Sequence, residues 1–107
     1  MDEIDRRCIR RQYVYLIENV KHLDTILGIL LSNEILTEYN VEDIREEKTK
    51  YQKIRKFLHI LSRRGPTAFS HFIEALNETG QSDIVEKLKN ETAELCNEQS
   101  LPKQDLK

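Results

Sequence analysis

The sequence contains few of the residues that interrupt helices or connect short strands. Among its 107 residues there are three glycines, two prolines and no tryptophan. Sandwiches and barrels of β-strands are rich in Gly/Pro turns, so this composition argues against an all-β fold. The two cysteines, Cys8 and Cys96, are too few and too far apart for a zinc framework, and we expect both to be free thiols.

Long apolar runs are also absent. No stretch approaches the ~20 apolar residues that span a membrane. The N-terminal segment, residues 1–7, lacks the apolar core of a signal peptide. We therefore expect a cytosolic protein that does not bind membranes, and the length suits one domain without a separate substrate domain.

Motifs that would indicate an enzyme are missing as well. The sequence has no Gly-rich phosphate loop, no Gly-x-Ser-x-Gly elbow and no His-Glu-x-x-His pair. His22, His59 and His71 do not have the spacing of metal ligands. Cys96 has no Gly-rich context for an oxyanion site. We expect a non-catalytic domain without a cofactor, a metal or a small-molecule substrate.

Apolar residues recur with helical spacing through most of the chain. The pattern predicts an all-α, six-helix antiparallel bundle around one core. The expected helices cover about 3–20 and 23–32 and then follow caps or first-turn residues at Asn40, Thr49, Pro66 and Ser82.

Local signals support these helix ends. Thr49 and Gln52 fit a capping box, and Gly65 and Gly80 are placed to end helices in a left-handed conformation. The apolar pattern disappears after Cys96. We therefore predict one domain over residues 1–95 and the start of a flexible linker over residues 96–107.

Charge is unevenly distributed, although the formal net charge is only −2. Residues 34–47 contain six acidic side chains and one basic one, and residues 48–64 contain seven basic side chains and no acidic one. Surfaces of opposite sign on one domain suit head-to-tail contacts with similar domains. Solvated helix faces are the simpler interpretation of the same pattern.

The basic run raises the alternative of a nucleic-acid-binding helical domain. Such domains usually combine a basic patch with a high pI or with stacking aromatic residues. Here the pI is about 5.9, and Tyr51 and Phe57 lie on a stripe that is expected to face the core. We therefore expect no nucleic-acid partner.

Several segments resemble a known family. These are Arg64-Gly65-Pro66-Thr67-Ala68-Phe69 and Glu78-Thr79-Gly80-Gln81, supported by residues 1–7 and 41–44. Over about residues 1–90 the chain resembles a caspase-recruitment domain (CARD), a six-helix member of the death-fold superfamily. The likeness is greatest to the prodomains of apoptotic initiator caspases. Residues 35–38 are also similar to an adaptor that recruits caspase two, so an adaptor CARD stays an alternative.

The resemblance implies a homotypic interaction module that recruits an initiator caspase to an apoptotic activating platform. The implied partner is the CARD of an apoptotic protease-activating factor or a related adaptor, with self-association as a further expectation. If the full protein is a caspase, its catalytic cysteine and histidine would lie downstream of Lys107.

In this family a basic face on the first and fourth helices meets an acidic face on the partner's second and third helices. The resemblance implies a basic face that includes Arg10, Arg11 and Arg55. The chain has tyrosine at positions 13 and 51, where the family has arginine, and Lys53 and Lys56 are partial substitutes. Both tyrosines also lie on apolar stripes that are expected to face the core. The acidic residues expected to form the opposite face are Glu38, Glu42 and Asp43.

Overall fold

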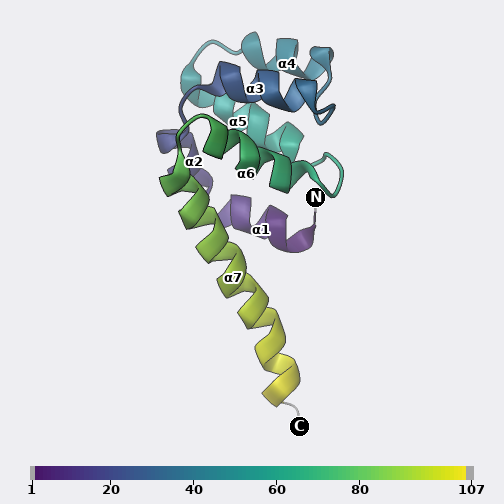
Figure 1. Cartoon of the computed structure of the whole chain (residues 1–107), viewed down its shortest axis with the longest axis vertical. Helices are drawn as coiled ribbons and strands as arrows, with labels where there is room; N and C mark the ends of the chain where they lie inside the picture. Colours follow the sequence, from purple (N-terminus) through teal and green to yellow (C-terminus); the bar gives the residue numbers. More distant parts are fainter. Residues whose placement is uncertain (1, 106–107) are drawn as a thin grey trace.

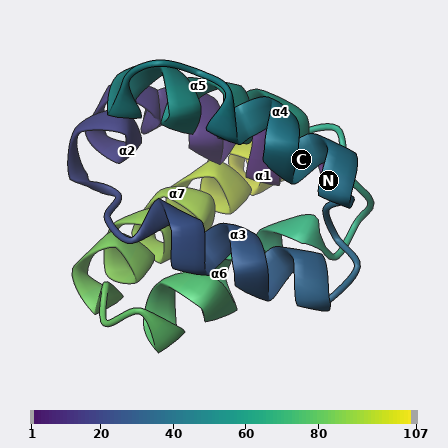
Figure 2. The same ribbon diagram turned by 90° about the horizontal axis from the view of Figure 1, so that it is seen from above.

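The computed structural model describes residues 2–105, and within this range it contains seven helices and no strand. The helices are α1 (Glu3–Arg11), α2 (Tyr13–Asn19), α3 (Leu23–Ser32), α4 (Glu38–Arg45), α5 (Lys50–Leu61), α6 (Ala68–Glu78) and α7 (Ser82–Asp105). Helices α3 and α6 lie side by side on one side of the bundle, and α5 lies with α2 and α4 on the other (Figure 2).

The expected helix over residues 3–20 is divided in two. The described residues therefore contain seven helices where six were predicted. The break is at Gln12, whose φ of −99° and ψ of 19° lie outside the helical region. The Gln12 amide donates a hydrogen bond to Glu91 Oε1 at 2.8 Å, and Arg11 Nη1 lies 3.2 Å from Glu91 Oε2. The bend allows α1 to pack against α7 while α2 packs against α5.

Helix α7 is longer than the sequence indicates. It continues through residues 96–105, which were expected to begin a flexible linker, and it ends at Asp105. Its C-terminal half projects away from the other helices (Figure 1). Residues 106–107 of the expected linker lie outside the described residues, and the domain boundary near residue 95 stays a prediction.

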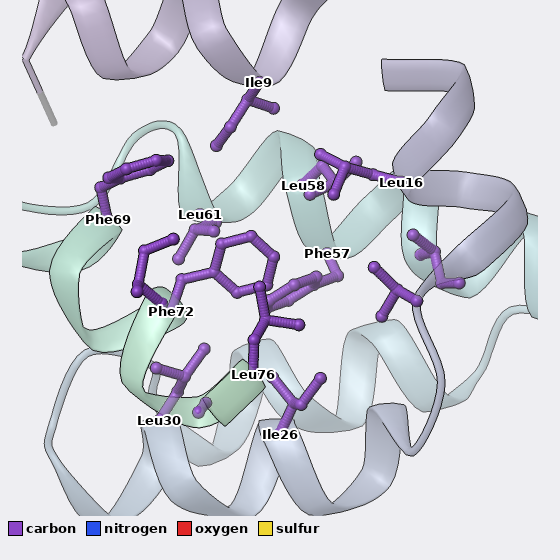
Figure 3. Close-up of a cluster of buried hydrophobic side chains, with 14 of the residues drawn as sticks. Ile9, Leu16, Ile26, Leu30, Phe57, Leu58, Leu61, Phe69, Phe72 and Leu76 are labelled. Atoms are coloured by element: carbon purple, nitrogen blue, oxygen red, sulfur yellow. The ribbon is translucent and has the colours of Figure 1, made fainter. Parts of the chain in front are cut away.

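The core is formed by the apolar stripes of all seven helices, at positions that the spacing predicts. Phe57 and Phe72 are fully buried at its centre, with ring centroids 5.5 Å apart and an angle of 65° between the rings. Ile26 and Leu30 of α3 pack below them and Leu16 of α2 beside them (Figure 3). Edge-to-face packing of this kind adds to the stabilisation from burial alone.

Tyr51 does not belong to this core, and its predicted place there is wrong. Its side chain is 56% exposed. Tyr51 lies in the first turn of α5, and the buried residues of that helix begin one turn later at Ile54. The other stripe tyrosine, Tyr13, is half-buried and packs against the edge of the core.

Two helix starts show how well the capping signals work. Thr49 caps α5 as predicted, because its hydroxyl accepts a hydrogen bond from the Gln52 backbone N–H at 3.1 Å. Helix α4 is capped by Thr37 instead of Asn40, and Asn40 is the third helical residue of that capping box. Threonine and asparagine are both good N-caps, but the helix begins after Thr37.

The turn between α6 and α7 is held by a buried glutamine. Gly80 has a φ of 76°, as a helix-ending glycine should, whereas Gly65 does not have a positive φ and its predicted left-handed role is wrong. Gln81 follows and is 5% exposed. Its amide nitrogen donates to the carbonyl of Lys21 at 2.7 Å, and its amide oxygen accepts from the Lys21 backbone N–H at 2.7 Å. This pair joins the α2–α3 connection to the α6–α7 turn.

Cys8 is a packing residue at the contact between α1 and α7. It is fully buried, and its thiol donates to the carbonyl of Leu88 at 3.4 Å. Burial raises the pKa of Cys8 to about 12, so the thiol is neutral at physiological pH. Cys96 is an exposed free thiol. Within residues 2–105, no helix has both the length and the apolar character to cross a membrane.

The two thiols predict different reactivity. In the native protein at pH 8, Ellman's reagent is expected to modify Cys96 rapidly and Cys8 only after unfolding, because the reagent needs an accessible thiolate. The measurement is the titre of released thionitrobenzoate, near one equivalent before denaturant and near two after it. Rapid release of two equivalents from the folded protein would contradict the placement of Cys8.

Replacement of a core leucine tests how much the packing of α3 contributes to stability. Leu30 is 0% exposed, so Leu30→Ala is expected to lower the free energy of unfolding by about 2–5 kcal/mol through lost burial and a residual cavity. Urea denaturation followed by circular dichroism measures the change. Leu31→Ala, at a partly buried position of the same helix, is the matched control and should cost less. Equal midpoints for the two variants would contradict the core assigned to α3.

Candidate partner-binding surface

An open groove lies between α1 and α5, with a volume of about 610 Å³. Arg6 and Arg10 of α1 line one side of it, and Arg55 and Lys56 of α5 line the other. Arg6 and Arg10 are four residues apart and therefore lie on the same face of their helix. The groove is a concave surface whose two sides are cationic.

Apolar and acidic groups complete the lining. Ile9 and Tyr13 contribute apolar surface at the end near the bend, and His59 lies one turn beyond Arg55. One carboxylate, that of Glu47 in the α4–α5 connection, also lines the groove. A ligand for this surface would need several negative charges and some apolar surface.

The groove brings together three of the five basic residues that the sequence predicts as one face. Arg10, Arg55 and Lys56 line it, although 45 positions separate the first two in the sequence. Lys53 does not line it and is only half-exposed on α5. Arg11 is turned to the opposite side of α1, where it pairs with Glu91 of α7.

The predicted acidic face is divided as well. Glu38 and Glu42 are exposed and lie four residues apart on α4. Asp43 is turned toward α5, and its Oδ2 atom lies 3.3 Å from Lys56 Nζ. Glu47 Oε2 lies 3.5 Å from the same ammonium. One predicted basic residue and one predicted acidic residue therefore neutralise each other within the molecule.

These contacts have a clear effect on Lys56. Its hydrogen bond to Asp43 and the two nearby carboxylates raise the pKa of Lys56 above its ordinary value. The side chain is therefore charged at physiological pH and held toward α4. Within the described part of the chain, Arg10 and Arg55 are exposed and form no ion pair, so no carboxylate of the domain offsets their charges directly.

Sequence reasoning missed several residues of the groove. Arg6 and His59 share helix faces with Arg10 and Arg55, and this spacing was a signal that could have found them. Glu47 gave no such signal, because it lies in a connection between helices where no periodicity predicts the direction of a side chain. Tyr13 was expected in the core and instead lies between the core and the groove.

Comparison with known proteins identifies the family of this chain. The family model described as caspase recruitment domain matches residues 6–91. The chain belongs to the CARD family. The match confirms the expected resemblance and includes the whole groove and Glu91. The extra helix of this CARD arises from the break at Gln12, which divides the first helix of the expected six.

Three relatives of this CARD are two caspases and a protein named cell death protein 3. Human caspase-9 is 33% identical over 91 residues, which is 83% of this chain and 22% of the relative. Chicken caspase-2 is 36% identical over 66% of this chain and 17% of the relative. Cell death protein 3 of Caenorhabditis remanei is 28% identical over 79% of this chain and 17% of the relative. The chain therefore spans about a fifth of the length of the relatives it matches.

Charge reversal at the two adjacent arginines of α1 is expected to affect stability differently. Arg11→Glu should lower the free energy of unfolding by about 1–3 kcal/mol, because it places a second carboxylate beside Glu91, whose side chain is only 11% exposed. Arg10→Glu changes an exposed side chain and should leave the melting temperature nearly unchanged. Thermal unfolding measures both, and equal losses would contradict the structural role of Arg11.

Proposed function

We propose that this CARD recruits an initiator caspase to an apoptotic activating platform by binding the CARD of an apoptotic protease-activating factor in its α1–α5 groove. The observation that supports the proposal is the convergence of Arg10, Arg55 and Lys56 on one concave surface. The relationship to caspase-9 and caspase-2 supports the choice of platform. On this proposal the complex forms in the cytosol.

The partner would present carboxylates on a helix that enters the groove. Each exposed ion pair contributes only about 0.2–1 kcal/mol, so one groove binds weakly. Complementary charge raises the association rate and disfavours partners of the wrong sign. A platform that gathers several copies multiplies weak contacts through effective concentration, and binding then depends on assembly.

The exposed carboxylates of α4 would extend such an assembly. Glu38 and Glu42 are exposed on α4, so they can meet the basic groove of a second copy. Asp43 is held by Lys56 and is a weaker candidate for this contact. Self-association would then use two surfaces of opposite sign, and both surfaces would be filled only inside a stack.

We also propose that the chain is the recruitment segment of a longer cysteine protease. Two of the three relatives are named caspases, and this chain corresponds to about a fifth of their length. A longer reading frame decides between a caspase and an adaptor, because a caspase contains a Gln-Ala-Cys-x-Gly segment. A second interaction domain in its place would support the adaptor.

Charge reversal in the groove tests the partner contact. Arg55→Glu is expected to lower the affinity for the CARD of the human apoptotic protease-activating factor by about tenfold or more, because it places like charges across the contact. Isothermal titration calorimetry at low salt measures the change. Arg63→Glu is the matched control, since Arg63 is exposed but does not line the groove.

The folded state of each variant is checked by circular dichroism before binding is measured. Parent-like affinity of a folded Arg10→Glu/Arg55→Glu variant would show that the partner uses a different face. A loss of affinity in Arg63→Glu as large as in Arg55→Glu would indicate a general effect of net charge instead of a groove contact.

A further inference from the structure

Glu47 occupies an unusual position for an acidic residue. It lies in the connection from α4 (Glu38–Arg45) to α5 (Lys50–Leu61), and its backbone N–H donates to the carbonyl of Ile44 at 3.1 Å. The side chains on either side of it, Glu46 and Lys48, are exposed. The Glu47 side chain is only 31% exposed, because it is turned into the groove.

Apart from Glu47, the charged residues that line the groove are basic. Its carboxylate lies 3.5 Å from Lys56 Nζ, and Arg10 and Arg55 line the same surface. Asp43 also pairs with Lys56 but does not line the groove, so it holds the ammonium from the side of α4. Of the two carboxylates on Lys56, Glu47 is therefore the one that an incoming acidic group would meet.

We propose that Glu47 is a tethered competitor that occupies the cationic groove of the unbound domain and must be displaced by an acidic partner. This inference rests on the proposed function of the groove. The Glu47 carboxylate imitates one carboxylate of the partner and repels others. Asp43 keeps Lys56 in place when Glu47 leaves, so the groove is ready for the partner's carboxylate.

Tethering makes Glu47 selective. A group held by a short segment of chain acts at an effective concentration of about millimolar, so a ligand with one carboxylate displaces it poorly. A partner with several carboxylates on one helix also gains contacts with Arg10 and Arg55, which Glu47 does not pair with. Glu47 would therefore set a threshold that excludes weakly acidic segments and admits strongly acidic ones.

Neutralising Glu47 tests this role, and the chain offers a matched control. Glu47→Gln keeps the shape of the side chain and removes its charge. Glu46→Gln makes the same change at the adjacent, exposed residue that does not line the groove. Two probes are titrated at low salt, the CARD of the human apoptotic protease-activating factor by calorimetry and inorganic triphosphate by NMR shifts of the arginine side chains.

Glu47→Gln is expected to bind both probes about two- to five-fold more tightly than Glu46→Gln, and the advantage should shrink as salt screens the groove. Triphosphate bound equally by the two variants, or more weakly by Glu47→Gln, would overturn the inference. The second result would mean that Glu47 positions Lys56 instead of competing for it.

The two probes separate this inference from the proposed function. Tighter triphosphate binding by Glu47→Gln, with no binding of the partner CARD to any variant, would support the competitor and refute the proposed partner. Partner binding that is lost in Arg55→Glu but equal in Glu46→Gln and Glu47→Gln would support the partner and refute the competitor.

Discussion

The packing of α1 against α7 is the constraint on which the groove between α1 and α5 depends. Gln12 and Arg11 both bond to Glu91 at the point where the first predicted helix breaks. The buried Cys8 thiol donates to the carbonyl of Leu88 in the same contact between α1 and α7. Because α1 packs against α7 while α2 packs against α5, the space between α1 and α5 stays open. The groove is therefore a consequence of how the N-terminal helix is divided, and a straight helix over residues 3–20 would run past α5 differently.

Some of the charged side chains of this domain form ion pairs within the molecule, and others are exposed without an ion pair. Lys56 is held by Asp43 and Glu47, whereas Arg10 and Arg55 face outward into the groove. A surface that neutralised all of its charges would not attract a partner, and a surface that neutralised none would bind any acidic protein. The arrangement found here lies between these limits, and it is consistent with the proposed function, in which the domain binds weakly until a platform concentrates it.

The sequence predicts well those features that depend on neighbouring residues. The apolar stripes and the Thr49–Gln52 capping box follow from spacing of three or four residues. The capping box is confirmed, and so are the stripes apart from positions such as Tyr51. Features that depend on distant residues could not be predicted. At the break, Gln12 bonds to Glu91, which is 79 positions away in the sequence. Tyr51 lies on the apolar stripe of α5 but is exposed, because the buried part of that helix begins one turn later at Ile54.

The candidate site shows the same division. Helical periodicity places Arg6 with Arg10 and Arg55 with His59, and the family resemblance indicates which helices carry the basic face. Neither kind of reasoning could show that Glu47 turns into the groove, because the direction of a side chain in a connection depends on the packing of both flanking helices. The groove therefore combines a cationic lining that the sequence can suggest with an internal carboxylate that only the fold reveals. If that carboxylate competes with the partner as proposed, the affinity of a recruitment domain is determined as much by its connections as by its helices.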